Sequence, residues 1–386
     1  MAVEMYQVTL PSKICFGVGC LNNLETEAVR VGAKRALIVT DPGVKQAGLV
    51  EPVIEQINQA KVPVTVFADS EPEPTIPRIN EIAKSYTGSD YGIIIGLGGG
   101  SAIDTAKGLS VLLAHGGRIE DYMGNERIPG PGIPLITIPT TAGTGSEITK
   151  YAIYGDPEKG LKLGLISTYI LARSALVDPT FTYSCPPKVT AAAGIDALVH
   201  AIECYTARTA HHISDALAVA AIRLITGSLA AAVKKGTNKQ ARNNMSEGAL
   251  IAGIAFGNSS VAAIHAMAYP LGSRFHVPHG VANGLLLPYV TEANLPANYS
   301  KYAGIARLLG VTTQGLSDKE AAEQGVAAMK QLVADIGLPN RLRDLNVPED
   351  ALEGMAMATM DITRLLEVNP KQFTLDEVRQ IWRNAW

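Results

Sequence analysis

The sequence predicts a two-domain protein in which an α/β half is followed by an all-helical half. The chain has 386 residues, which is more than one typical core, since a domain averages about 150 residues. Short β-branched runs alternate with helical patterns as far as residue 184, and this alternation indicates a mostly parallel sheet. After Pro186-Pro187, apolar residues recur at helical spacing and strand patterns disappear. We therefore predict domains at 1–184 and 185–386.

The strands and helices of the first half can be placed individually. Runs of apolar and β-branched residues predict strands at 35–40, 62–68, 91–95 and 135–138. Helical spacing of apolar residues predicts helices at 49–60, 76–86 and 102–114. A glycine-rich segment joins the third of these strands directly to the third helix.

Composition and charge exclude several classes of protein. The chain is 47% hydrophobic and 18% charged with a net charge of -3, which is typical of a soluble globular protein. A basic stripe that could neutralise phosphates is absent, so nucleic acid is not an expected partner. The start of the chain lacks the pattern of a secretory signal, and we expect a cytoplasmic protein. The apolar stretch 216–233 contains Arg223 and suits a buried helix, so no membrane span is predicted.

The segment Gly96-Leu97-Gly98-Gly99-Gly100-Ser101 lies between a predicted strand and a predicted helix. Glycines in this position let backbone N–H groups approach a phosphate, and the helix N-terminus adds partial positive charge. The segment therefore predicts a pyrophosphate cradle, although a tight turn without a ligand is the alternative. Asp104 and Lys107 follow on the helix, either as ordinary surface charges or as supporting residues behind the cradle.

Asp41 stands at the end of the strand predicted at 35–40. A carboxylate in this position can accept hydrogen bonds from both ribose hydroxyls and repel a 2′-phosphate, which predicts NAD rather than NADP. The alternative is an aspartate that only opens the turn formed by Pro42-Gly43. Both interpretations remain open from the local sequence.

Three histidines and two acidic residues in the second half form a candidate metal site. Asp196 and His200 are four residues apart and share one helix face, which Glu203 continues. His265 lies in an apolar helical stretch, and His279 lies between a proline and a glycine. A single histidine in an apolar helix is more often a core residue, but one carboxylate with three imidazoles suits Fe(II), Zn(II), Co(II) or Ni(II). For Glu203 a salt bridge or a supporting contact is expected rather than ligation.

Ordered motifs along nearly the whole chain resemble the iron-containing (group III) alcohol dehydrogenase family. The resemblance implies a dinucleotide-binding, Rossmann-like α/β domain and an all-α domain, in a dehydroquinate-synthase-like architecture with the metal and substrate between them. It also implies a homodimer or a multiple of one. The motifs are Gly17-Val18-Gly19, Leu37-Ile38-Val39-Thr40-Asp41, Gly98-Gly99-Gly100-Ser101-x-x-Asp104-x-x-Lys107, Pro139-Thr140-Thr141-Ala142-Gly143-Thr144-Gly145-Ser146-Glu147, Asp196-x-x-x-His200-Ala201-x-Glu203 and Pro278-His279-Gly280.

The resemblance also implies roles for individual residues. Asp196, His200, His265 and His279 become the ligands of a divalent metal, Fe(II) with Zn(II) as the alternative. Lys162 becomes a contact of the nicotinamide ribose. The residues expected to bind NAD are Asp41, Gly98, Gly99, Gly100, Ser101, Asp104, Thr140, Thr141, Thr144 and Lys162.

The chain departs from the family pattern at two positions. Many members carry a histidine four residues after the third ligand, where this chain has Tyr269. Tyr269 or His276 could relay a proton to the reacting oxygen, and the alternative is that Tyr269 only shapes the pocket. The second departure is Glu73, where relatives often carry an asparagine near the adenine.

The sequence therefore predicts a metal-dependent, NAD-linked alcohol dehydrogenase. It would transfer hydride reversibly between NAD and a short-chain primary alcohol or diol, with the metal as Lewis acid. Two alternatives stay open. One is a reductase of a hydroxy acid or another charged carbonyl, for which Arg274 is the nearest obvious cation. The other is a metal- and NAD-dependent cyclase of the dehydroquinate-synthase kind, which would need a basic phosphate pocket.

Overall fold

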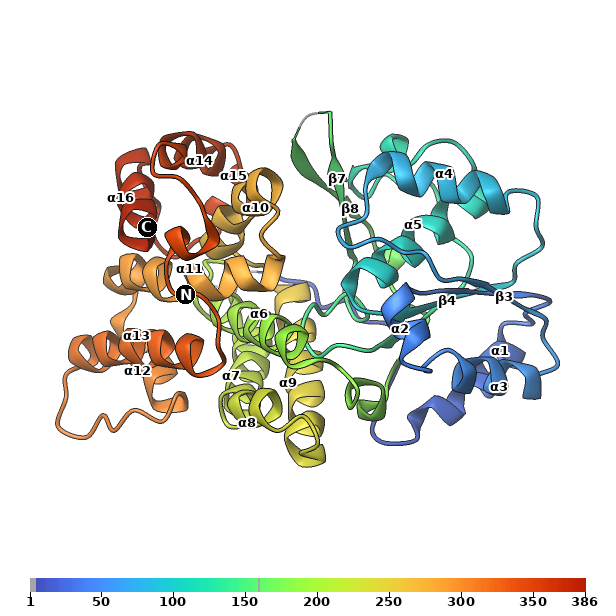
Figure 1. The fold of residues 1–386 in the computed structure, drawn as a ribbon, viewed down its shortest axis with the longest axis horizontal. Helices are drawn as coiled ribbons and strands as arrows, with labels where there is room; N and C mark the ends of the chain where they lie inside the picture. The colour runs from blue at the N-terminus through green and yellow to red at the C-terminus, as the bar shows by residue number, and fades with distance from the viewer. Residues whose placement is uncertain (1–4, 159) are drawn as a thin grey trace. The chain divides into compact units, whose positions relative to one another are not determined.

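A computed structural model describes residues 5–158 and 160–386 of the chain (Figure 1). Contacts within the chain divide it into two compact units. The sheet unit comprises Thr9–Cys185, and the helical unit comprises Pro186–Trp386 together with residues 5–8. The sequence patterns did not indicate that residues 5–8 belong to the helical unit. This segment is short and lies far in sequence from the helices that it contacts, so no local pattern reveals the contact. Here the ring of Tyr6 stacks on His211 of the helical unit, with ring centroids 4.0 Å apart.

The sheet unit is built on a six-stranded parallel sheet with the order β1-β9-β6-β4-β2-β3. The strand order reverses between β2 and β4, which is the point where open α/β sheets bind ligands beyond the carboxyl ends of their strands. The strands of this sheet are β1 (Lys13–Phe16), β2 (Ala36–Val39), β3 (Val64–Phe67), β4 (Ile93–Gly98), β6 (Leu135–Pro139) and β9 (Ser174–Val177).

Helices cover both faces of this sheet. In Figure 1, α4 (Ile76–Tyr86) and α5 (Gly100–His115) lie on one side, and α1 (Asn23–Arg30) and α3 (Glu51–Gln59) lie on the other. Successive side chains of a strand point to opposite faces. Accordingly Leu37 and Val39 of β2 pack with the α4–α5 core, while Ala36 and Ile38 pack with the α1–α3 core. The predicted parallel sheet is confirmed.

The strands and helices predicted in the first half are present, but most of the glycine-rich segment belongs to regular structure and not to a loop. β4 continues to Gly98, and α5 already begins at Gly100. At Gly96 a Cβ atom would lie only 3.0 Å from the Cβ of Ala106, so glycine lets the strand run on beneath the helix. A second, three-stranded sheet that the sequence patterns did not indicate has the order β5-β8-β7, from Gly124–Asn125, Leu161–Ile166 and Tyr151–Asp156.

The second half is helical throughout its described secondary structure, as predicted. α6 (Pro187–Thr206) is buried along most of its length and packs against α7, α9 and α11. The remaining helices are α7 (His212–Thr226), α8 (Leu229–Lys234), α9 (Lys239–Asn258), α10 (Ala263–Phe275), α11 (His279–Asn294), α12 (Tyr299–Leu308), α13 (Asp318–Asp335), α14 (Ala351–Met360), α15 (Thr363–Leu366) and α16 (Leu375–Ala385). The short helix α2 (Pro42–Gln46) belongs to the sheet unit.

Within residues 5–158 and 160–386, one helical stretch, 212–234, is long and apolar enough to cross a membrane by length and composition. A bent pair formed by α9 and α10 passes the same test. The first stretch divides into α7 and α8, and α7 packs against α6 and α9. Buried helices of globular proteins commonly show such composition, so these helices are weak evidence for a membrane protein.

Candidate metal centre and dinucleotide site

Asp196 and His200 lie on α6, where both side chains are almost completely buried. Their separation of four residues puts them one above the other on the same face of the helix. The Nε2 atom of His200 lies 3.9 Å from Oδ2 of Asp196. Phe256 of α9 stacks on the imidazole, with ring centroids 4.1 Å apart, and thereby holds the ring in the core.

His265 and His279 reach the same carboxylate from two further helices. His265 is in the first turn of α10, and His279 is the first residue of α11. The Nε2 atom of each lies 3.8 Å from Oδ1 of Asp196. Ligand atoms of Asp196, His265 and His279 all lie within 4.8 Å of one another, close enough to hold one ion. The structure thus brings all four predicted ligands to a single point, with Asp196 at its centre.

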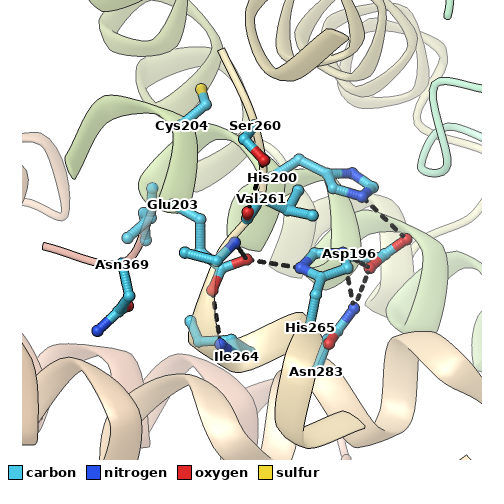
Figure 2. Close-up of polar contacts among 12 residues, drawn as sticks. Asp196, His200, Glu203, Cys204, Ser260, Val261, Ile264, His265, Asn283 and Asn369 are labelled. Atoms are coloured by element: carbon cyan, nitrogen blue, oxygen red, sulfur yellow. Dashed lines mark hydrogen bonds and ion pairs between the residues drawn. The ribbon is translucent and has the colours of Figure 1, made fainter. Parts of the chain in front are cut away.

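Glu203 supports His265 from behind (Figure 2). Its carboxylate accepts hydrogen bonds from the backbone N–H groups of Ala262 and Ile264, at 2.9 and 2.6 Å. It also lies 2.6 Å from Nδ1 of His265. An anionic acceptor on this nitrogen favours the tautomer with the proton on Nδ1, so the lone pair of Nε2 faces Asp196. Glu203 therefore has the supporting position expected from the sequence.

Asn283 is a member of this cluster that the sequence analysis missed. Its Nδ2 atom donates to Oδ1 of Asp196 at 2.6 Å (Figure 2), and lies 3.2 and 3.1 Å from the Nε2 atoms of His265 and His279. The side chain is completely buried. The available signal was its spacing, because Asn283 is four residues after His279 and so lies on the same face of α11.

The electrostatics of the cluster keep Asp196 ionised. Burial by itself would raise the pKa of Asp196, but the imidazoles of His200, His279 and His265 and the hydrogen bond from Asn283 bring the pKa below its usual 3.8. A buried carboxylate facing three imidazole nitrogens, without a thiolate, is a ligand set that suits a divalent transition metal. The residues present therefore fit the ion that the family resemblance implies.

Gly280 fixes the place of His279 in the cluster. A Cβ atom at this position would lie 2.1 Å from the carbonyl oxygen of Ala192 on α6. The start of α11 therefore runs against the backbone of α6, one helical turn before Asp196. Only glycine permits this approach, since any side chain would push the two helices apart.

The two predicted proton-relay residues occupy different surroundings. Tyr269 of α10 is half-buried, and its ring centroid is 6.2 Å from that of His279. His276 is exposed and ends α10 in the left-handed backbone conformation, with φ 53°. Both roles stay predictions, and the geometry favours Tyr269. Arg274 is exposed, and its Nη1 lies 2.5 Å from where a Cβ atom of Gly354 on α14 would stand.

The predicted dinucleotide residues of the sheet unit gather beyond the carboxyl ends of β2 and β4. Asp41 opens α2, because its Oδ1 accepts the backbone N–H of Val44 at 3.0 Å. Its Oδ2 faces the glycine segment, 3.2 Å from where a Cβ of Gly98 would lie. The turn-forming role of Asp41 is thus confirmed and leaves one carboxylate oxygen pointing to the predicted cradle.

The threonine segment packs against the same glycines. The backbone N–H of Thr140 donates to the carbonyl of Gly98 at 3.0 Å. Thr141 and Thr144 lie 3.5 and 3.0 Å from where Cβ atoms of Gly99 and Gly100 would stand. A Cβ atom at Gly100 would crowd the Thr144 side chain, so glycine at this position lets the threonine segment pack closely against the start of α5. These contacts make neighbours of seven predicted residues, namely Asp41, Gly98, Gly99, Gly100, Thr140, Thr141 and Thr144.

Lys107 is buried and Asp104 is half-buried, and both side chains are held by hydrogen bonds within the sheet unit. Oxygens of Asp104 accept the hydroxyl of Ser146 and, at 2.9 Å, the backbone N–H of Ile153. The Lys107 side chain is fully buried, and its Nζ donates to Ser146 Oγ at 3.2 Å and to the carbonyls of Thr149 and Tyr151 at 2.9 and 2.5 Å. The surface interpretation of Lys107 is wrong, because the segment 146–151 covers this side of α5 and keeps the ammonium group from water. These contacts tie the threonine loop to α5.

Glu147, next to this group, gives the sheet unit a pH dependence that can be measured. Burial raises its pKa from 4.5 to about 7, against the weaker opposing effects of backbone hydrogen bonding and of Lys107. Since the folded protein holds this proton more tightly than the unfolded chain, the stabilisation is complete below pH 4.5 and is lost as the pH rises through 7.

We therefore expect Glu147→Gln to remove this loss. Chemical denaturation of both proteins measures their free energies of unfolding. As the pH rises from 4.5 to about 7, the unfolding free energy of the variant should increase relative to that of the wild type by about 3 kcal/mol. The difference between the two curves isolates this carboxyl, because all other groups are shared. Parallel curves would contradict the assignment.

Comparison with known proteins identifies relatives of both halves. Residues 11–179 match the family described as iron-containing alcohol dehydrogenase, and residues 190–386 match the C-terminal part of the Fe-containing alcohol dehydrogenase family. The chain is 40% identical over 387 residues to long-chain-alcohol dehydrogenase 1 of Geobacillus thermodenitrificans, covering 100% of this chain and 98% of the relative. It is 34% identical over 376 residues to the NAD-dependent methanol dehydrogenase of Bacillus methanolicus, covering 97% and 98%.

The fold of the whole chain has also been seen before. A crystal structure of a 1,3-propanediol oxidoreductase superimposes with a TM-score of 0.96 at 36% sequence identity, over 99% of this chain and 100% of the other. Alcohol dehydrogenases thus match the full length in both sequence and structure, and neither a cyclase nor a reductase of charged carbonyls is favoured. The chain is an oxidoreductase that belongs to the iron-containing alcohol dehydrogenase family.

Proposed function

We propose that this protein is a metal-dependent, NAD-linked alcohol dehydrogenase that acts reversibly on a short-chain primary alcohol or diol. The observation that carries the proposal is the convergence of three imidazole Nε2 atoms on the buried carboxylate of Asp196, each 3.8 to 3.9 Å from one of its oxygens. The names of the relatives, which include a 1,3-propanediol oxidoreductase and an NAD-dependent methanol dehydrogenase, support the choice of substrate and cofactor.

In this proposal the helical unit provides the metal and substrate site. Asp196, His200, His265 and His279 would hold Fe(II), with Zn(II) as the alternative. When bound, the ion supplies Lewis-acid polarisation of the alcohol or carbonyl oxygen, and NAD supplies the hydride acceptor. Glu203 keeps the proton of His265 on Nδ1, so the Nε2 lone pair is directed to the position where the four ligand side chains meet.

The sheet unit would bind NAD. The backbone N–H groups at the start of α5 would face the pyrophosphate, and Oδ2 of Asp41 would accept the ribose hydroxyls and repel the 2′-phosphate of NADP. The predicted domains 1–184 and 185–386 then correspond to the cofactor half and the metal half. Tyr269 would pass the proton through its hydroxyl, with His276 as the second candidate. A cytoplasmic homodimer is part of the same proposal.

Metal removal and reconstitution test this function. The protein is stripped with a chelator, reloaded with Fe(II) or Zn(II), and assayed with a panel of alcohols and diols for the formation of NADH and NADPH. We expect NADH formation to vanish with the metal and return with it, and NADPH formation to stay far lower. Turnover that persists without metal would contradict the proposal, as would a reaction without net NADH, which is what a cyclase gives.

A further inference from the structure

Glu73 and Lys162 form an ion pair in the sheet unit, with Oε1 and Nζ 2.8 Å apart. The side chain of Lys162 is only 11% exposed, whereas that of Glu73 is 41% exposed. The lysine is therefore nearly buried, and the carboxylate stands on the more exposed side of the pair.

The backbone of Glu73 joins this pair to the predicted cradle. Its N–H donates to Oγ of Ser101, in the first turn of α5, at 3.1 Å. The next residue, Pro74, accepts the N–H of Gly155 on β7 at 3.0 Å, so the segment bridges α5 and the small sheet. Glu73 has φ 52°, a left-handed conformation that residues other than glycine, asparagine and aspartate rarely adopt. Strain of this kind persists where the surroundings hold it and is frequent beside ligand sites.

We propose that Glu73 lowers the affinity of this protein for its dinucleotide by occupying Lys162. The inference rests on the proposed function, in which Ser101 belongs to the pyrophosphate cradle and Lys162 contacts the cofactor. A carboxylate beside a site for an anionic ligand opposes binding, and it also holds the cation that the ligand would use. The cofactor must break the Glu73–Lys162 pair to gain Lys162, and the cost of breaking it weakens cofactor binding.

Direct titration of the intact protein with NADH, followed by the fluorescence of the reduced nicotinamide, tests this without turnover. We expect Glu73→Gln to lower the Kd for NADH by about tenfold, which is the lower end of the effect of one charge-assisted hydrogen bond returned to the ligand. Glu73→Asn is the second variant, because asparagine tolerates a positive φ and preserves the loop if glutamine does not.

Glu71→Gln is the matched control. Glu71 lies in the same loop, but its carboxylate pairs with Arg78, 3.3 Å away, and not with Lys162. Its removal changes the net charge equally, so the Kd should stay within twofold of the wild type. Lys162→Met should weaken binding, and adding Glu73→Gln to it should bring no tightening, because the cation that glutamate withholds is then gone.

The outcomes separate the two proposals. Tightening in Glu73→Gln that is absent from Glu71→Gln and from the Lys162→Met background supports the inference. An unchanged or higher Kd in both Glu73 variants overturns the inference. Equal tightening in the Glu71 control also overturns it, because the effect would then come from the change in net charge and not from the Glu73–Lys162 pair. Failure of the wild-type protein to bind NADH at all would instead contradict the proposed function.

Discussion

His265→Ala should lose its bound metal and its turnover together while keeping the fold. Both ring nitrogens of His265 contact the cluster: Nε2 lies near Asp196, and Nδ1 is hydrogen-bonded to Glu203. Without it the site loses one nitrogen ligand and the tautomer control that Glu203 exerts. We expect kcat/KM for alcohol oxidation to fall on the order of a thousandfold, the scale of lost Lewis-acid catalysis.

The fold should survive because Glu203 retains two backbone donors, Ala262 and Ile264. A loss of about 2 kcal/mol in unfolding free energy is the expected cost of leaving the carboxylate without its imidazole. Metal content by elemental analysis, steady-state kinetics and thermal melting measure the three effects. His212→Ala, at an exposed position on α7, is the control and should match the wild type. An active His265→Ala protein free of metal would refute the metal-centre assignment.

Gly280→Ala should separate α11 from α6 and thereby weaken the metal site. The added methyl group would stand 2.1 Å from the Ala192 carbonyl oxygen, which is backbone and cannot swing away. Displacement of α11 would carry His279, the first residue of that helix, away from Asp196. We expect a loss of about 3 kcal/mol in unfolding free energy, at the upper end for overpacking, and at least a tenfold weaker metal affinity.

Gly304→Ala is the matched control for this substitution. Gly304 also lies within a helix, α12, but a Cβ there would meet nothing nearer than 3.8 Å. The same change should therefore be neutral or stabilise the protein by up to about 1 kcal/mol, since alanine favours the helix over glycine. Denaturant unfolding and competition with a chelator measure both effects. Equal stability and equal metal affinity in the two variants would show that the α6–α11 contact does not position His279.

The local sequence patterns determined four strands and three helices of the sheet unit, the helical character of the second half, and the Asp196–His200 pair of the metal centre. Strands and helices have hydrophobic patterns that repeat every two to four residues, and the glycine segment is a short continuous run. Both can therefore be identified from neighbouring residues alone. The spacing of Asp196 and His200 also specifies a shared helix face without further information. His265 and His279 needed the family resemblance, because their approach to Asp196 depends on how three helices pack.

The tertiary structure decided what lies behind and beside these residues. Lys107 has the sequence context of a surface charge, but its ammonium group is held by carbonyls more than forty positions further along the chain. Asn283 and the Glu73–Lys162 pair likewise join segments that are distant in sequence. Local sequence patterns indicate which face of a helix or strand is apolar. The polar partner that each buried charge finds is set by the packing of several elements at once, and only the folded structure records it.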